Sequence, residues 1–330
     1  MSARNLSKKD QAAFKRYKFD EILINKIAQY TLINKTDNYH GPLAIIEDWT
    51  IIVLCAMISQ YVFNNIHLKF AWTFVDIPVI CIIGARQRGL ARGLHEATHG
   101  CFASNKYLNF FLGTFCSGYV IFQSFYGYQT SHVKNHHPYL GTDRDPDYVQ
   151  NNICGINRST ANVKRYLRSL FLPSASVNYL LYLIKYRIWT KDDDHYETLI
   201  RCIYLGSLVS IFFHSGNILL LLLYWIIPYF TTHMWIGSFI ELMEHYPMIE
   251  TAPRIDIFMT RNRLCGWFWN FFFGVHNEQY HLVHHLFPKV PEWEYHNVHR
   301  ILMQDSTYAN LHEKLGWKNL IKEIIEVDEK

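Results

Sequence analysis

The sequence predicts an all-α integral membrane protein with four transmembrane helices in two hairpins and a cytoplasmic helical cap that carries a histidine-rich metal site. Three observations predict this fold class: four apolar stretches in two close pairs, basic residues gathered at one end of each pair, and 18 histidines among 330 residues. Charged residues make up 18% of the chain, below the ~25% usual for soluble domains, and hydrophobic residues make up 50%. This composition excludes a disordered chain and indicates membrane spans combined with a large polar part.

Four apolar stretches predict the transmembrane helices. They run over about 49–64, 70–84, 199–214 and 218–237. Several approach the ~20 residues that a spanning helix needs. The turns within each pair are nearly free of Lys and Arg, whereas Arg86, Arg88 and Arg92 follow the second stretch and Lys185 precedes the third. By the positive-inside rule, both termini and the long segment 85–197 are expected in the cytoplasm.

Two shorter apolar segments, 107–125 and 267–275, are predicted to lie along the membrane interface. The first is marginal in length and contains Gly113 and Gly118, and the second is too short to span. If the first segment crossed the membrane, the histidines on its two sides would face opposite compartments. We therefore divide the chain into an N-terminal cytoplasmic basic segment (1–48), a membrane domain (49–288) and a C-terminal cytoplasmic helical tail (289–330).

Three histidine motifs share the predicted cytoplasmic side. Box 1 is H-E-A-T-H at 95–99, box 2 is H-V-K-N-H-H at 132–137, and box 3 is H-L-V-H-H at 281–285; the single His245 follows the fourth stretch. Residues i, i+3 and i+4 project from one face of a helix, so each box is expected to present its imidazoles together as one metal-binding unit. Eight or nine histidines exceed the three or four ligands that one zinc ion takes, so the count predicts two metal ions.

The order and spacing of the boxes resemble those of the integral-membrane fatty acid desaturase and hydroxylase family. Residues 277–288, N-E-Q-Y-H-L-V-H-H-L-F-P, are similar to the family signature N-x-x-Y-H-x-x-H-H-L-F-P, and the resemblance extends over about 42–302. It implies a membrane desaturase-like domain with a non-haem di-iron centre and O2 as co-substrate. The ligands that it implies are His95, His99, His132, His136, His137, His281, His284 and His285, together with His245, which matches an extra histidine after the last span in many members.

Five further residues are predicted to support these ligands: Glu241, Glu244, Asp145, Asp147 and Asn277. Glu244 and the two aspartates are candidate acceptors for imidazole N–H groups, and a role as solvated acids is the alternative. Glu241 stands where some relatives have a water-bridging Asn, so a direct or a water-mediated role is open. Asn277 is the first residue of the signature.

The chemistry that follows from this resemblance is oxidation of an alkyl chain. Removal of hydrogen from an unactivated C–H bond needs an oxidant stronger than any side chain, which a di-iron centre provides with O2. The resemblance therefore implies an oxidoreductase that introduces a double bond into an alkyl or acyl chain. A hydroxylase or ketolase of the same family, acting on a lipid or a small metabolite, is the alternative. A remote alternative is a membrane zinc metalloprotease, because His95-Glu96-Ala97-Thr98-His99 matches H-E-x-x-H.

The sequence also predicts partners. It contains no H-P-G-G motif of cytochrome b5 type, no flavin fingerprint and no ferredoxin cysteine cluster, so a separate electron donor of ferredoxin or cytochrome b5 type is expected. An acidic donor would dock on the basic surface formed by Lys134, Arg158, Lys164, Arg165 and Arg168, for which lipid-headgroup binding is the alternative. The other expected partners are a lipid or acyl substrate and the membrane, with no nucleic acid. A bacterial inner membrane is favoured over the endoplasmic reticulum.

Overall fold

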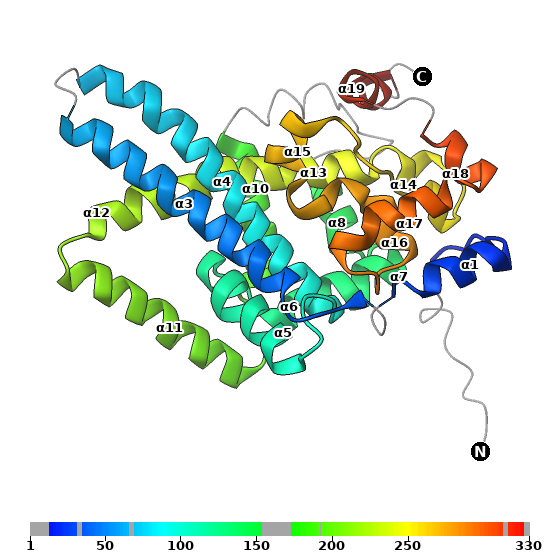
Figure 1. The fold of residues 1–330 in the computed structure, drawn as a ribbon, viewed down its shortest axis with the longest axis horizontal. Helices are drawn as coiled ribbons and strands as arrows, with labels where there is room; N and C mark the ends of the chain where they lie inside the picture. The colour runs from blue at the N-terminus through cyan, green and yellow to red at the C-terminus, as the bar shows by residue number, and fades with distance from the viewer. Residues whose placement is uncertain are drawn as a thin grey trace.

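The computed structural model describes residues 13–31, 35–65, 69–153, 173–191, 193–312 and 316–326. Within these ranges the chain forms helices and no strand, apart from one isolated bridge between Lys15 and Ile255. The all-α class predicted from the sequence is therefore confirmed. Figure 1 shows long helices extending to one side and shorter helices gathered at the other end.

Two long helices form the first hairpin, α3 (His40–Asn65) and α4 (Lys69–His99). They lie side by side over most of their length (Figure 1). Helix α3 begins earlier than the predicted 49, because Pro42 is tolerated in a first helical turn and the Asp37 carboxylate accepts hydrogen bonds from the N–H groups of Tyr39 and His40 at 3.0 Å. Helix α4 continues beyond the predicted 84 to His99. The second apolar stretch and box 1 therefore share one continuous helix.

The second pair begins with α11 (His195–His214), whose first turn is capped by Asp194, which accepts from the N–H of Glu197 at 2.9 Å. A short turn with Gly216 at φ 72° reverses the chain. A helical run then extends over Ile218–Thr251. This run contains the predicted span 218–237 and continues through His245, so that histidine is fixed at the end of an apolar helix.

Among the described residues, three helical segments are long and apolar enough to cross a bilayer: α3, α11 and Ile218–Thr251. Large apolar side chains of these segments are exposed, among them Met57, Ile203 and Phe213. Exposed apolar surface on this scale is typical of a membrane contact, and it supports a membrane protein. The stretch 70–84 lies in α4, whose apolar part ends at Arg86, and α4 is not one of these three segments.

An apolar cavity of about 580 Å³ lies on the hairpin side, between α3, α11 and the helical turn Leu222–Ile226. Trp49 and Trp225 contribute to its lining, and their rings are stacked with centroids 5.1 Å apart. No histidine of boxes 1 to 3 lines it. The cavity is thus separate from the box histidines.

The segment predicted to lie along the interface, 107–125, is broken into short pieces. Helix α5 (Lys106–Gly113) is followed by a π turn (Thr114–Gly118) and a 3-10 turn (Tyr119–Ile121), and the chain then bends at Phe122, whose φ is 68°. None of these pieces is long enough to span a bilayer. The same is true of α15 (Trp267–Phe273) in the second such segment.

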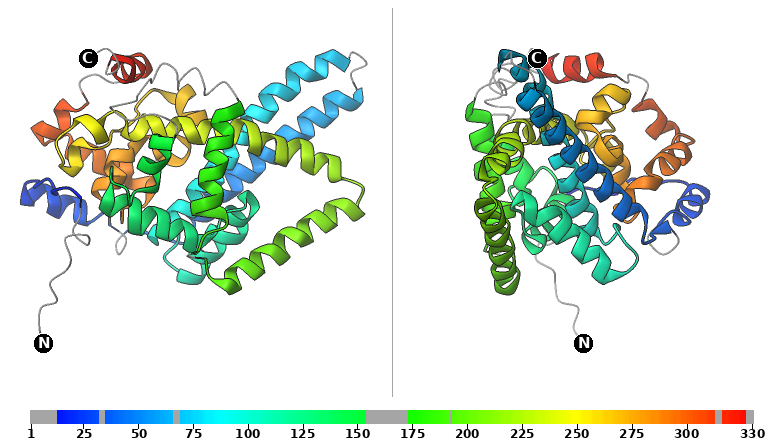
Figure 2. Two further views of the ribbon diagram at one scale, coloured as in Figure 1. Left: turned by 180° about the vertical axis from the view of Figure 1, so that it is seen from behind. Right: turned by 60° about the vertical axis from the view of Figure 1, so that its left-hand side comes forward.

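Helices from the two ends of the chain lie around box 3, at the end of the molecule opposite the hairpin tips (Figures 1 and 2). Leu282 and Val283 of box 3 pack in a core with Ile27, Val298 and Leu302 from the two ends of the chain. The other elements are α1 (Glu21–Ala28), α6 (Phe125–Tyr128), η4 (Gln129–His136), α7 (His137–Tyr139), α8 (Pro146–Ile153), α10 (Pro173–Leu183), η5 (Ile184–Ile188), α12 (Ile218–Leu221), η6 (Leu222–Ile226), η7 (Tyr229–His233), α13 (Met234–His245), α14 (Met248–Thr251), η8 (Asp256–Phe258), η9 (Val275–Tyr280), α16 (His281–Leu286), η10 (Glu292–Glu294), α17 (Tyr295–Leu302), α18 (Ser306–Asn310) and α19 (Trp317–Glu326).

Gly113 allows α5 to approach the helix that carries box 1. A Cβ atom at Gly113 would lie 2.3 Å from the Cβ of Ala97. Gly113→Ala is therefore expected to destabilise the protein by about 1–3 kcal/mol through overpacking, measured as a lower thermal unfolding midpoint in detergent. Gly206→Ala in α11 is the control, because no atom lies within 4 Å of its added Cβ. Equal midpoints for the two variants would contradict this prediction.

Candidate metal centre

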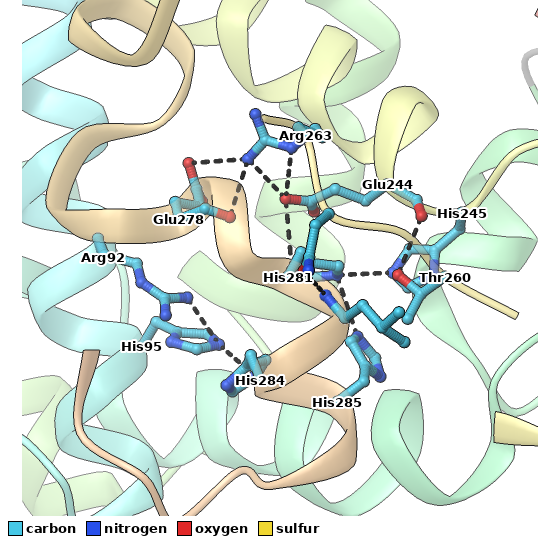
Figure 3. A network of polar contacts seen from close by, with 12 residues as sticks. Arg92, His95, Glu244, His245, Thr260, Arg263, Glu278, His281, His284 and His285 are labelled. Carbon is cyan, nitrogen blue, oxygen red and sulfur yellow. Dashed lines mark hydrogen bonds and ion pairs between the residues drawn. The ribbon is translucent and has the colours of Figure 1, made fainter. Parts of the chain in front are cut away.

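The nine predicted histidine ligands come from helices far apart in the sequence. Box 1 lies in the last turns of α4, box 2 spans η4 and the start of α7, and box 3 opens α16. His245 is the last residue of α13. Figure 3 shows the part of this site where His95, His245 and box 3 converge.

The ring nitrogens of these histidines form two groups, and within each group they lie within 4.8 Å of one another. The five-histidine group contains His95, His99, His132, His137 and His284, and the four-histidine group contains His136, His245, His281 and His285. All nine predicted ligands thus fall into one group or the other. The expectation that each box acts as one unit is wrong for boxes 2 and 3, which divide their histidines between the groups. Adjacent helical residues point in directions about 100° apart, so His136 and His137 face different groups.

Distances between the Nε2 atoms test whether a metal ion fits. Nε2 of His95 lies 2.8 Å from that of His132 and 3.0 Å from that of His284. Nε2 of His281 lies 3.0 Å from those of both His245 and His285. Two nitrogens that are each about 2.1 Å from one ion, and about 90° apart around it, would lie about 3.0 Å apart. The donor atoms therefore fit one metal ion in each group.

One further nitrogen supports this fit. The Nε2 atom of His99 is buried and has no hydrogen-bond partner among the described residues. A buried ring nitrogen without a partner is costly unless a ligand satisfies it. A metal ion in the five-histidine group would do so.

The Nδ1 atoms of several ligands point outward to acids. Nδ1 of His136 lies 2.8 Å from Asp145 Oδ1 and 3.0 Å from Asp147 Oδ2, and Nδ1 of His281 lies 3.3 Å from Glu244 Oε1. Such contacts fix the ring orientation and leave Nε2 free to bind a metal. Three of the five predicted supporting residues are thus in contact with a candidate ligand.

The other two predicted supporting residues differ. Among the described residues, neither Glu241 nor Asn277 hydrogen-bonds to a box histidine. Asn277 and His276 both have positive φ, 62° and 52°, and they turn the chain immediately before α16. His276 contacts Asp48 Oδ2 at 2.9 Å, away from both groups. The predicted roles of Glu241 and Asn277 at the metal stay predictions.

Sequence reasoning missed the contacts that orient the remaining rings. The Tyr295 hydroxyl lies 3.0 Å from Nδ1 of His284, and Glu96 Oε1 lies 3.0 Å from Nδ1 of His95. Nδ1 of His245 faces the carbonyl of Met259 at 3.4 Å. Tyr295 belongs to the following helix, and its only signal in the sequence is its place on an apolar stripe. In the sequence, Glu96 is indicated only as the base of the H-E-x-x-H motif.

Two buried arginines form ion pairs with the acids that contact the histidine groups. Arg263 forms ion pairs with Glu244 at 2.8 Å and with Glu278 at 3.7 Å (Figure 3). Arg92 forms ion pairs with Glu96 at 2.7 Å and with Glu292 at 3.3 Å. These contacts hold Glu244 and Glu96 against His281 and His95.

Arg92 also reaches the five-histidine group itself. Its Nη2 donates to the Tyr295 hydroxyl at 3.1 Å, and its Nη1 lies 3.3 Å from Nε2 of His95 (Figure 3). The Arg92 guanidinium therefore contacts the candidate ligand His95 and also the two side chains, Tyr295 and Glu96, that contact Nδ1 atoms of ligand rings.

Electrostatics keep most of the imidazoles neutral. Burial and neighbouring imidazoles hold the pKa of His132, His137 and His284 well below its usual range. Neutral imidazole is the form that binds metals. His136 differs: burial lowers its pKa, but the nearby Asp145 and Asp147 carboxylates outweigh burial and raise it to about 9. A metal ion in the four-histidine group has to displace that proton.

Comparison with known proteins now decides the family. The family model described as fatty acid desaturase matches residues 71–317. The chain belongs to the fatty acid desaturase family. Dihydrorhizobitoxine desaturase of Bradyrhizobium elkanii is 31% identical to it over 294 residues, which cover 86% of this chain and 80% of that relative. The resemblance drawn from the three boxes is confirmed, and this desaturase-family protein is a desaturase-like oxidoreductase.

Asp145→Asn is expected to weaken metal binding by the four-histidine group about 10-fold to 100-fold, because His136 loses a charged acceptor. The amide still offers an oxygen to the N–H of Gly141, which Asp145 accepts at 2.9 Å, so the loop should keep its shape. Iron bound per chain at a series of buffered free Fe²⁺ concentrations measures the effect. Asp143→Asn is the matched control, since Asp143 is exposed. Unchanged iron affinity in Asp145→Asn would show that this contact does not support a ligand.

Proposed function

We propose that this protein is a membrane-bound, O2-dependent, non-haem di-iron oxidoreductase that introduces a double bond into an alkyl or acyl chain. The observation that carries the proposal is the pair of histidine groups, whose Nε2 atoms converge at spacings that fit two metal ions. When bound, a di-iron centre supplies, with O2, the oxidising power needed to take hydrogen from an unactivated C–H bond. By its name, the relative desaturates dihydrorhizobitoxine, which favours desaturation over hydroxylation.

The chain's own residues orient the ligands. Acids and the Tyr295 hydroxyl fix the imidazole planes, so no reorganisation is needed when the metal binds. His284 and His136 are buried, whereas His99, His137 and His285 keep partial exposure. We therefore expect the substrate chain to approach from the side of the partly exposed rings.

We further propose the membrane arrangement and the electron donor. The helices α3, α4, α11 and the run from Ile218 cross the membrane as two hairpins, with both termini and the metal centre in the cytoplasm, in a bacterial inner membrane. The distribution of basic residues along the sequence supports this orientation. The electrons come from a separate protein of ferredoxin or cytochrome b5 type. Lys134 of the expected docking surface is exposed, while Arg158, Lys164, Arg165 and Arg168 lie outside the described residues.

The deciding experiment measures iron and zinc in the detergent-purified protein, together with O2 uptake and mass spectrometry of products on expression. About two irons per chain and a product lighter by two hydrogens are the expected result. Iron with a product heavier by one oxygen would indicate a hydroxylase. One zinc without iron, with activity lost in Glu96→Gln, would overturn the proposal in favour of the protease.

A further inference from the structure

Glu241 is an acid beside the metal centre, and no described residue forms a hydrogen bond or close ion pair with it. It lies one helical turn before His245 on α13, and its carboxylate makes no hydrogen bond or ion pair within the part of the chain that the structure describes. The other acids around the centre each contact a cation or an imidazole: Glu96, Asp145, Asp147, Glu244, Glu278 and Glu292. Glu241 is also only half-buried. The residue thus keeps some exposed surface, and its carboxylate has no hydrogen-bond partner among the described residues.

The side chains around Glu241 are polar. We call Arg88, Tyr128, Tyr179, Arg187 and Glu241 the polar cluster; the two arginines are within electrostatic reach of the Glu241 carboxylate. Tyr179 lies across the same face of α13, since a Cβ at Gly237, one turn before Glu241, would meet the Tyr179 hydroxyl at 2.6 Å. Among the described residues the Tyr179 hydroxyl, like Glu241, has no hydrogen-bond partner.

The polar cluster borders the five-histidine group. The Tyr128 ring lies 6.1 Å from that of His95 and 5.5 Å from that of His132, measured between centroids. Arg88 precedes His95 by two turns on α4, and Glu241 precedes His245 by one turn on α13, so both lie on the faces of their helices that carry candidate ligands. A molecule that contacts the polar cluster is therefore close to the metal centre.

The unused hydrogen-bonding capacity in this cluster is that of an acceptor. Arg88 is paired with Glu278 at 2.8 Å, and Arg187 donates to the Tyr182 hydroxyl at 2.6 Å. The Nε atoms of both arginines lack partners but are fully enclosed, so a ligand cannot reach them. The groups without hydrogen-bond partners among the described residues are the partly exposed Glu241 carboxylate and the buried Tyr179 hydroxyl; the carboxylate accepts hydrogen bonds, and the hydroxyl can accept or donate one.

These unpartnered polar groups disfavour a purely apolar ligand. An alkyl chain against Glu241 would leave the carboxylate desolvated and unpaired, which is unfavourable. A protonated primary amine satisfies it, because the ammonium group carries a positive charge and three N–H donors, one of which can also reach a hydroxyl.

We propose that the substrate carries a protonated primary amino group that binds Glu241, with its alkyl chain extending beside the histidine groups. This inference rests on the proposed function and narrows its substrate class to amine-bearing chains. An alkylamine and an amino acid share the ammonium group, and the experiment distinguishes them.

Calorimetric titration of the iron-loaded, full-length protein in detergent tests the inference with three six-carbon probes: hexylamine, L-norleucine and hexanoate. We expect hexylamine to bind and hexanoate not to bind. Glu241→Gln is expected to weaken hexylamine binding roughly 10-fold to 100-fold, the loss of a charge-assisted hydrogen bond, with iron content and thermal midpoint unchanged. Norleucine binding as tight as that of hexylamine, or tighter, would identify an amino acid as the source; norleucine binding much weaker would identify an alkylamine.

Several outcomes would overturn the inference. Absence of hexylamine binding at millimolar concentration, or equal binding to the wild type and Glu241→Gln, would do so. Loss of iron in Glu241→Gln would assign the residue to the metal centre instead. Glu21→Gln, at an exposed site on α1, is the matched control. If the protein binds about two irons and desaturates a chain that carries no amine, this inference is wrong and the proposed function still holds.

Discussion

His284→Ala is expected to reduce the iron content from about two ions per chain to about one and to abolish product formation. His284 is fully buried, and its Nε2 lies 3.0 Å from that of His95 and 2.9 Å from that of His137. It thus supplies a donor at the middle of the five-histidine group, which the alanine methyl group cannot replace. Metal analysis of the purified variant and mass spectrometry of its products measure the two effects.

The control for this prediction is His214→Ala, because His214 is exposed at the far end of α11. It should keep both irons and full activity. Since His284→Ala also leaves a cavity, its thermal midpoint has to be compared with that of the wild type without metal. Two irons retained in a folded His284→Ala protein would remove His284 from the set of ligands.

The candidate ligand histidines could be identified from the sequence because each box is a local pattern. His95 and His99, for example, lie four residues apart, and that spacing alone places both rings on one face of a helix. How the boxes combine was not predictable from spacing. His136 and His137 are adjacent in sequence but belong to different groups, and this assignment depends on where α13 and α16 pack against η4.

The residues that contact the ligand rings were likewise only partly predictable from the sequence. Asp145 and Asp147 follow box 2 closely, so a contact with His136 was a reasonable expectation from sequence. Tyr295 and Arg92 reach their partners only through tertiary packing, over separations such as the 203 residues between them. In the fold, hydropathy located the apolar stretches, but the end of α4 depends on polar contacts made by Arg88 and Arg92 inside the protein rather than on its own apolar character.

Arg92→Met is expected to destabilise the folded protein by about 3–5 kcal/mol, because it leaves two buried acids without their cation. Arg92 is 3% exposed, and its partners Glu96 and Glu292 are 1% and 3% exposed. Methionine retains much of the aliphatic volume, so the loss reports the charge rather than a cavity. Chemical unfolding in detergent, followed by tryptophan fluorescence, measures the free energy of unfolding. Arg300→Met is the matched control, since Arg300 is exposed on α17.

A compensating variant separates the ion pairs from other contributions of Arg92. If the cost comes from unpaired carboxylates, then neutralising them in Arg92→Met/Glu96→Gln/Glu292→Gln should recover a large part of the lost stability, since neutral buried amides cost less than buried charges. If the triple variant recovers stability but not iron binding, then Arg92 and Glu96 also orient the His95 ring, because Glu96 contacts Nδ1 of His95 at 3.0 Å. A triple variant no more stable than Arg92→Met would contradict the electrostatic account and place the contribution of Arg92 in its contact with Tyr295.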